Sequence, residues 1–302
     1  MSTVQTRGEL GGGVGGGLPQ SLPQLRNLAE TKRKDLWWIQ PLLVFLGFGA
    51  FIVYSTWAAL QGDYYFVRGA EYISPMYSPL LFESWKVGTP SGHAWFGPWP
   101  TWMPSVLAFV PLTPAFLILW VPGGFRFTCY YYRGAYYKAF WADPPSCAVG
   151  EPSFRKTRYR GEQKWPLIFQ NLHRYFMYLA VLFIFLLSYD AIKSFWFPDW
   201  GPGGGAAHSG RFGIGVGSLI MTANAVLLAC YTLGCHSLRH FIGGRKDHLS
   251  ELGAKKRAYD CVSCLNRRHM LWAWVSLFWV GFTDFYIRMV AMGNIHDFRI
   301  TF

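Results

Sequence analysis

Five stretches of the chain are apolar for long enough to cross a bilayer, and polar, Gly-rich or charged segments separate them. A transmembrane helix needs about 20 predominantly apolar residues. The second stretch carries Pro104, Pro111 and Pro114, which predict a kinked helix whose freed carbonyls are satisfied by neighbouring helices. The five predicted spans are roughly 36–60, 103–121, 172–195, 212–242 and 270–292.

This pattern predicts an all-α integral membrane protein, a five-helix transmembrane bundle. We expect a flexible tail over 1–34, a membrane domain over 35–295 and a C-terminal tail over 296–302. No cleavable signal peptide is expected, because the first residues are Gly-rich and polar. The long loop 61–102 is rich in Tyr, Trp and Pro and is expected to form an ordered cap.

The placement of Lys and Arg predicts the orientation of the bundle. The segments 1–35, 123–170 and 243–269 hold 5, 8 and 7 of the 28 Lys and Arg residues, and the opposite side holds only 6. By the positive-inside rule, the N-terminus is cytoplasmic and the C-terminus is outside. The net charge of +12 therefore belongs to one face of a cell membrane, and nucleic-acid binding loses its main support.

Composition excludes other classes of protein. Only 15% of the 302 residues are charged, against roughly 25% in soluble domains, so a water-soluble enzyme is not expected. The chain has no nucleotide-binding loop, no nucleophile–base arrangement and no flavin-binding Gly motif, and the Gly run at 11–17 precedes no strand–helix unit. Any substrate chemistry must be performed by another subunit.

Cysteines and histidines gather on the predicted cytoplasmic side, which argues against structural disulfides and favours metal ligation. His236 and His240 are four residues apart and share a helix face. Cys261 and Cys264, followed by His269, have the spacing of a metal-binding knuckle. The candidate ligands are His173, Cys235, His236, His240, Cys261, Cys264 and His269, with Cys129 and Cys147 as weaker candidates.

Two cofactors fit these residues. A b-type haem needs two imidazoles from facing helices, such as His173 with His240 or His236 with His269. A Rieske-type 2Fe–2S cluster needs two Cys on one iron and two His on the other. Zinc would accept the same atoms, but a closed, redox-inert zinc site gives no reason for burial in a membrane.

Two carboxylates fall inside predicted spans, where ionisable groups are costly and usually functional. Asp284 lies one turn before Arg288, which suggests an ion pair, and Asp190 is able to pair with Lys193. The functional alternative for both carboxylates is proton exchange with a quinone. The polar groups suited to hold a quinone beside the redox centre are Arg174, Tyr175 and Arg239.

Together with the five spans and the Cys/His cluster, four runs carry a family resemblance: FRFTCYYYRGAYYKAFWADPPSCAV (125–149), QNLHRYF (170–176), CHSLRH (235–240) and RRHM (267–270). The chain resembles the membrane-anchor, cytochrome b-like subunit of bacterial succinate dehydrogenases and fumarate reductases, most closely the actinobacterial kind. The resemblance covers roughly residues 35–292.

This resemblance implies cytoplasmic flavoprotein and iron–sulfur partner subunits, contact with membrane lipid, and transfer of electrons to menaquinone. Five-span anchors typically bind two b haems, but here no span has a histidine in its outer half, since His93, His208 and His296 lie in loops. A second, outer haem is therefore not expected, and the surplus of cysteines on the inner side makes an iron–sulfur cluster a serious substitute for the inner haem. A further small membrane subunit that completes the quinone pocket is compatible with the sequence.

Two other functions remain open at this stage. The first is an electron-transfer subunit that docks a different dehydrogenase. The second is a transporter or a non-redox membrane scaffold. Transporters place substrate groups near the bilayer midplane, where these spans have few polar groups besides Thr222 and Asn224.

Overall fold

The structure is a computed structural model. It describes residues 36–84, 94–102, 112–140, 163–198, 210–246 and 248–302, except Trp37, Pro166 and Arg245. Four of the described helical segments are long and apolar enough to cross a membrane: Ile39–Gln61, Leu167–Lys193, Val216–Leu233 and His269–Ala291.

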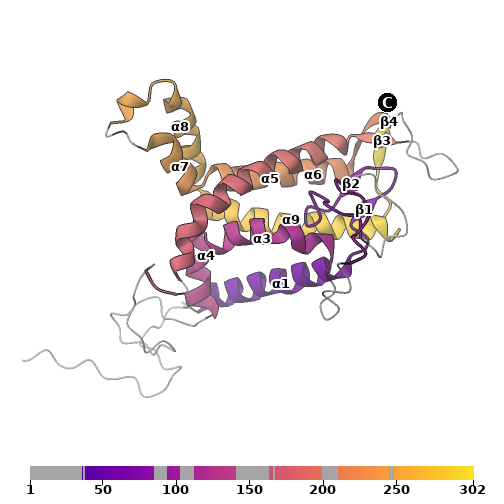
Figure 1. Cartoon of the computed structure of the whole chain (residues 1–302), viewed down its shortest axis with the longest axis horizontal. Coiled ribbons are helices and arrows are strands. Elements are labelled where there is room, and N and C mark those ends of the chain that lie inside the picture. The colour runs from indigo at the N-terminus through magenta and orange to yellow at the C-terminus, as the bar shows by residue number, and fades with distance from the viewer. Residues whose placement is uncertain are drawn as a thin grey trace, which may run out of the picture.

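The long helices form one elongated bundle (Figure 1). Its helices are α1 (Ile39–Gln61), α5 (His173–Lys193, preceded by the 3-10 turn Leu167–Leu172), α6 (Val216–Leu233) and α9 (His269–Ala291). Helix α6 packs between α5 and α9, and α1 packs on α9. A shorter apolar helix, α3 (Pro114–Phe127), packs on α5.

The two ends of the bundle differ. At one end, which we call the ligand end, α1, α5 and α9 begin and α3 and α6 finish, as Figure 1 shows. It also carries α4 (Tyr130–Ala135) with a π-helical turn (Tyr136–Phe140), and a projecting pair of helices. That pair is α7 (His236–Gly243) and α8 (Lys255–Asn266), with the 3-10 turn Leu249–Leu252 between them.

The opposite end, which we call the cap end, carries two small sheets. Strands β1 (Phe66–Val67) and β2 (Tyr72–Ile73) pair antiparallel. Strands β3 (Trp196–Pro198), β4 (Gly210–Gly215) and β5 (Arg299–Thr301) form a second antiparallel sheet in that order. Because β5 pairs with β4, the described residues of the expected C-terminal tail are part of this sheet.

The expected ordered cap is confirmed for the described part of the loop 61–102. Tyr65, Tyr72 and Tyr77 are buried there. The Tyr77 hydroxyl bonds the carbonyls of Ala58 and Ala59 at the end of α1, at 2.9 and 3.0 Å. These contacts satisfy carbonyls that a helix end leaves without partners.

The expected continuous helix over 212–242 is wrong. Residues 212–215 belong to β4, α6 ends at Leu233, and a new helix starts at His236. The break comes at Gly234 and Cys235, and Cys235 adopts an extended backbone (φ −65°, ψ 138°). Apolar residues continue on both sides of the break, so the hydrophobic pattern by itself predicts one uninterrupted helix.

The expected end of the second span at 121 is also wrong, because α3 continues to Phe127. Of the three prolines expected to kink this span, Pro114 instead begins α3, a position that suits its fixed φ. Pro122 lies inside the helix, and Pro104 and Pro111 fall outside the described residues.

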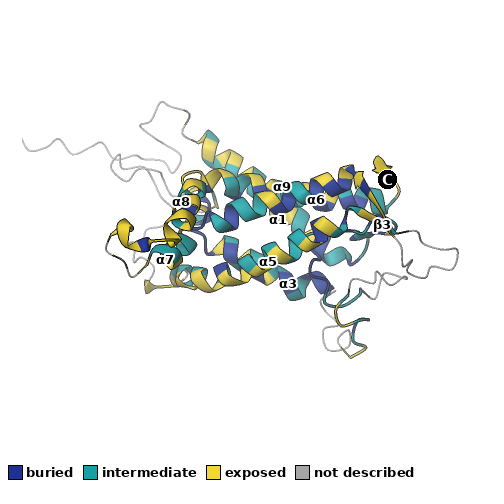
Figure 2. Cartoon of the chain, turned by 90° about the horizontal axis from the view of Figure 1, so that it is seen from above, coloured by how far each residue is buried: buried dark blue, intermediate teal, exposed yellow. Residues whose placement is uncertain are grey.

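The outward faces of the bundle are apolar. Leu43, Val53, Phe185 and Leu219 are all more than half exposed although they belong to helices of the bundle. Figure 2 shows exposed residues on the outward sides of the helices and buried residues along their inward sides. Lipid would cover the apolar outward faces, as expected for a membrane protein.

Candidate functional site

Two cysteines and two histidines from four segments meet at the ligand end of the bundle. His173 and His269 begin α5 and α9, and Cys129 and Cys235 precede α4 and α7 at their N-caps. The distance from Cys235 Sγ to His173 Nε2 is 3.1 Å, and that from Cys129 Sγ to His269 Nε2 is 3.9 Å. We call these four residues the Cys2His2 cluster.

The Cys2His2 cluster lies inside the protein. The exposed fractions are 2% for Cys129, 0% for Cys235 and 2% for His269, and His173 is half-buried. Burial raises the pKa of the Cys129 thiol and raises the pKa of Cys235 to about 11. Without metal, both groups are therefore neutral thiols at physiological pH, and metal binding must displace their protons.

The surroundings of His173 fix its tautomer. The Thr128 hydroxyl donates to the Gly124 carbonyl at 2.7 Å, and its oxygen lies 2.9 Å from His173 Nδ1. Because a hydroxyl has a single proton, Thr128 accepts a hydrogen bond from Nδ1–H. The lone pair of His173 is thus left on Nε2, the atom that faces Cys235, as metal-ligating histidines require.

His269 is held by packing. The Tyr231 ring stacks on it with centroids 5.0 Å apart, and Gly234 leaves room for the imidazole, because a Cβ there would lie 3.2 Å from Nδ1. The Nδ1 atom is buried and has no hydrogen-bond partner within the described residues. The buried Tyr231 hydroxyl lies beside the Cys129 thiol and interacts with it. The Nδ1 atom lies toward Gly234, and Nε2 is the atom of His269 that faces Cys129.

A half-buried arginine lies next to the cluster. Arg126, in the last turn of α3, donates to the Tyr132 hydroxyl, the Ala273 carbonyl and Ser276 Oγ at 2.7–2.9 Å. Its guanidinium also lies 4.6 Å from the Tyr231 ring centroid. A fixed positive charge beside a redox centre stabilises added electrons.

The four donors can be compared with the ligand sets of known metal centres by their chemical type. Within the described residues, no group of three or more His, Cys, Asp or Glu side chains is arranged to hold a metal ion. Instead each thiol of the Cys2His2 cluster lies against one imidazole. Two thiolates and two imidazoles are the ligands of a Rieske-type 2Fe–2S cluster.

Of the other predicted ligands, His236 directly follows Cys235 and lies near His173 and His269, whereas the rest that the structure describes lie on the exposed surfaces of α7 and α8. His236 and His240 lie on α7 with their Nε2 atoms 3.0 Å apart, and both are exposed. Cys261 and Cys264 are exposed on α8. Cys147 lies outside the described residues.

The residues predicted to hold a quinone are also dispersed. Arg174 and Tyr175 are exposed on the surface of α5. The Arg239 guanidinium bonds the Tyr259 hydroxyl at 3.0–3.1 Å, which joins α7 to α8. These three side chains therefore line none of the described pockets.

The two intramembrane carboxylates lie at the cap end, far along the helices from the cluster. The expected ion pair of Asp284 with Arg288 is confirmed, at 2.7 Å and fully buried. Asp284 also accepts hydrogen bonds from Tyr54 and Ser74, and Asp190 accepts one from Ser78. Lys193 lies 4.0 Å from Glu71. Both carboxylates thus fasten the cap to the bundle.

Sequence reasoning did not identify Arg126, Thr128, Tyr231 or Tyr132 as parts of this site. The sequence contains a feature that could have identified two of them. Arg126 is a charged residue in the last turn of an apolar helix, and Thr128 sits beside Cys129 in the run FRFTC.

The described residues thus form a mostly helical bundle with helices long and apolar enough to cross a membrane, and with thiol and imidazole side chains gathered at one end. The family model for actinobacterial succinate dehydrogenase subunit SdhC matches residues 39–293, so the chain belongs to that family. It is therefore a membrane subunit of a succinate dehydrogenase complex, and the family resemblance predicted from the sequence is confirmed.

A solved structure agrees with the family. The chain is similar to one in the structure described as the Mycobacterium smegmatis Sdh1 complex in the apo form. The two share 42% sequence identity with a TM-score of 0.73, over 91% of this chain and 96% of the other. A comparison with curated proteins gives no match.

Proposed function

We propose that this subunit passes electrons from a cytoplasmic iron–sulfur subunit, through a redox centre at its ligand end, to menaquinone. The observation that carries the proposal is the buried Cys2His2 cluster. Its four donors come from α4, α5, α7 and α9 and meet at one end of the bundle. The similar chain in the Sdh1 complex supports partner subunits of the succinate dehydrogenase type.

In this proposal Cys129, Cys235, His173 and His269 hold a Rieske-type 2Fe–2S cluster. Such a cluster, once bound, supplies reversible one-electron transfer at a higher potential than an all-cysteine cluster. Thr128 orients His173 from outside the ligand set, and Tyr231 packs against His269. The protein thereby holds the ligands rigidly and limits the approach of water.

A b-type haem is the alternative cofactor. It would use two imidazoles on opposite faces of a flat ring and leave both buried thiols without a role. In the structure each imidazole has a sulfur as its neighbour. The donor chemistry therefore favours the iron–sulfur cluster.

The proposed orientation places the ligand end at the cytoplasm. The projecting pair α7–α8 and its flanks carry Lys246, Lys255, Lys256 and Arg257 at this end, followed by Arg267 and Arg268 just before α9. Such basic residues suit a cytoplasmic face. Electrons then enter from the side where the flavoprotein and iron–sulfur subunits are expected.

Substituting ligands in the purified complex tests this function. We expect His173→Ala to remove the Rieske-type 2Fe–2S signal of this subunit in electron paramagnetic resonance. The same variant should abolish succinate-dependent menaquinone reduction. Succinate oxidation with an artificial dye acceptor should continue, because the other subunits perform it. Iron and acid-labile sulfide should each fall by two atoms relative to the unmodified complex.

Matched controls come from the surface of the same end. His240→Ala and the pair Cys261→Ser with Cys264→Ser should keep the signal and the activity, since these three side chains are exposed. Loss of the signal in these controls with full retention in His173→Ala would refute the ligand assignment. An optical haem band in the complex that disappears in His173→Ala would favour the haem.

A further inference from the structure

One face of the sheet at the cap end is both apolar and exposed. Strands β3, β4 and β5 form this sheet beside the C-terminus (Figure 1). Residues that lie opposite each other on paired antiparallel strands share a face of the sheet. Trp196 lies opposite Phe212, and Ile214 lies opposite Ile300. The same register places Phe302 opposite Phe212, whose carbonyl accepts the Phe302 backbone N–H at 2.8 Å. We call the face that carries these five side chains the outer face.

The side chains of the outer face are in contact with one another and with solvent. The Phe212 ring lies between the rings of Trp196 and Phe302, with centroid distances of 5.5 and 6.2 Å. All five side chains are 40–74% exposed. The remaining described positions on this face, Pro198 and Gly210, also carry no polar side chain. An antiparallel sheet with one covered face usually has polar residues on the other, so this outer face requires an apolar partner.

The opposite, inner face of the sheet is covered by the chain itself. Phe197 on this face is 4% exposed and makes an edge contact with the Tyr72 ring of β2 at 6.2 Å. Gly215 allows the two sheets to approach closely, because a Cβ there would lie 2.1 Å from the Tyr72 hydroxyl. The sheet is therefore fixed on the cap with its outer face turned away from the protein.

The outer face continues the apolar surface of two membrane-spanning helices. Strand β4 passes directly into α6 at Val216, and β3 starts three residues after the end of α5 at Lys193. Close to the sheet, Ile192 of α5 and Leu219 of α6 are 59% and 55% exposed. The expected cover of these helix surfaces is lipid. Lipid is therefore also the partner that suits the outer face.

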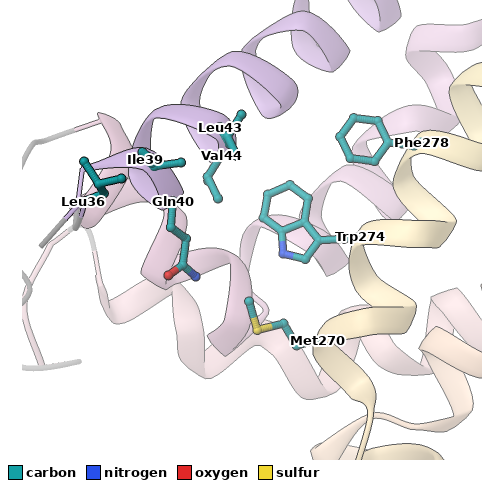
Figure 3. A pocket seen from close by; sticks show the side chains of 8 residues that line it. All are labelled: Leu36, Ile39, Gln40, Leu43, Val44, Met270, Trp274 and Phe278. Carbon is teal, nitrogen blue, oxygen red and sulfur yellow. The ribbon is translucent and has the colours of Figure 1, made fainter.

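Exposed apolar surface extends along the bundle to its opposite end. Figure 3 shows a groove between the first turns of α1 and α9, in which Leu43, Trp274 and Phe278 are apolar and Gln40 is polar. The apolar surface thus begins at the first turns of the helices at the ligand end. The outer face of the sheet marks how far it reaches at the cap end.

The length of α6 gives the sheet a reason to be apolar. The helix has 18 residues, whereas the other three candidate spans have 23, 27 and 23. At 1.5 Å per residue α6 is about 27 Å long. The hydrocarbon core of a bilayer is about 30 Å thick, so α6 alone is slightly short. The exposed Phe212 and Ile214 of β4 directly precede α6 in the chain and supply the missing apolar length.

We propose that the outer face of the β3–β4–β5 sheet lies in the lipid bilayer at the cap end, against the acyl chains just below the headgroups. Aromatic rings such as that of Trp196 are typical of this depth. Arg299 and Thr301 alternate with Ile300 along β5, so they lie on the opposite face and point toward water. The sheet then sets how deeply the cap end sits in the membrane, whatever cofactor the ligand end holds.

Adjacent residues of β5 give a matched pair for a test in the purified complex. Ile300 and Thr301 are both exposed and lie on opposite faces of the strand. Ile300→Cys or Thr301→Cys is made in a background with Cys261→Ser and Cys264→Ser and labelled with a nitrobenzoxadiazole fluorophore. The complex is reconstituted in vesicles of phosphatidylethanolamine and phosphatidylglycerol. The labelled background without the new cysteine corrects for all other thiols.

We expect the label on Ile300→Cys to emit at a shorter wavelength than the label on Thr301→Cys. It should lose intensity when the vesicles contain phosphatidylcholine with a doxyl group near the headgroup, and lose less with a doxyl group at the chain end. The label on Thr301→Cys should keep a water-like emission and be quenched little by either lipid. Dye-linked succinate oxidation should be unchanged in both variants, which verifies an intact complex.

Three results would overturn the proposal. A water-like emission from both labels would place the outer face in solvent. A label on Ile300→Cys that is shielded from water but quenched by neither doxyl lipid would show that a protein covers this face. Stronger quenching from the chain end than from the headgroup region would place the sheet at a different depth from the one proposed.

Discussion

At the scale of single residues, the site depends on where two helices break. Cys129 and Cys235 both follow an apolar helix, and both adopt an extended backbone, with ψ of 131° and 138°, before a short helix begins. An extended residue between helices turns the chain away from the bundle axis. Each cysteine is thereby buried beside an imidazole at the start of another helix.

Thr128 offers a prediction at this scale. Thr128→Val removes the oxygen that accepts the hydrogen bond from His173 Nδ1–H, so the imidazole loses its fixed orientation. Substituting a residue that hydrogen-bonds to a metal-ligating histidine typically lowers metal affinity or activity by roughly 10–100-fold. We expect less 2Fe–2S signal per complex and slower menaquinone reduction, measured by electron paramagnetic resonance and by quinone assay.

Thr128→Ser keeps the hydroxyl and serves as the matched variant. It should restore both the signal and the rate. Equal losses in the Val and Ser variants would show that the methyl group of Thr128, and not its hydroxyl, supports the site.

The sequence placed the four residues that meet among nine candidates but could not single them out. Local spacing pointed to His236 with His240 and to Cys261 with Cys264, because residues three or four apart on a helix share a face. Neither pair is buried in the structure. Cys129 and His269 are 140 residues apart, and their meeting depends on how α3 and α9 pack, which no local spacing records.

At the scale of helices, long apolar runs predicted three of the four long spans to within about five residues at each end, because crossing a bilayer requires a minimum apolar length. The break after Leu233 was missed since Leu238, Phe241 and Ile242 continue the apolar pattern. The structure shows a sharp change of direction there instead. Gly234, which caps the end of α6, is the residue whose type indicates this helix end in the sequence.

The contact between α3 and α5 supplies a test of helix packing. Gly124→Ala places a Cβ 2.3 Å from the Phe176 ring, so either the ring or α3 must move. Overpacking of this kind costs about 1–3 kcal/mol. We expect a lower Tm of the complex in detergent, followed by circular dichroism, and some loss of the 2Fe–2S signal because Phe125 and Thr128 lie on the same helix end.

The adjacent residue is a matched control for this substitution. Gly123→Ala places its Cβ in open space, and Ala has a higher helix propensity than Gly by about 1 kcal/mol. Its Tm should be unchanged or higher. A Tm loss in Gly123→Ala equal to that in Gly124→Ala would argue that helix backbone effects, and not contact with Phe176, decide the result.

The buried ion pair connects helices with the cap. Asp284 on α9 bonds Arg288, Tyr54 of α1 and Ser74 of the cap, and Arg288 donates to the carbonyls of Ala58 and Asp63. Asp284→Asn leaves the guanidinium buried without its counter-charge. Breaking a buried pair in this way typically costs about 3–5 kcal/mol. We expect a large fall in Tm.

The exposed pair Lys256–Asp260 on α8 gives the comparison. Its partners are 2.8 Å apart with more than half of each side chain in solvent, so Asp260→Asn should change Tm little. A similar Tm for Asp284→Asn and Asp260→Asn would mean that Arg288 finds other partners in the bundle.

At the scale of the whole molecule, the ligand end and the cap end have different chemistry. The ligand end holds the buried thiols and imidazoles, and most of the Lys and Arg residues fall in segments that flank it. The cap end holds two small sheets and tyrosines that seal the bundle. This asymmetry agrees with the proposal that electrons enter at the ligand end, because the thiol and imidazole side chains lie there and not at the cap end.

The orientation of the bundle follows from this asymmetry and has a direct test. Cys261 is exposed on α8 at the ligand end, and Arg299 is exposed on β5 at the cap end. By the positive-inside rule the ligand end faces the cytoplasm. A membrane-impermeant maleimide should therefore label Cys261 in inverted membrane vesicles and not in intact cells. In the variant Arg299→Cys, the new thiol should react in intact cells.

The opposite labelling pattern would contradict this orientation. If Cys261 were labelled from outside and Arg299→Cys reacted only in inverted vesicles, the thiol–imidazole site would face away from the cytoplasmic subunits. The proposed path of electrons would then be reversed.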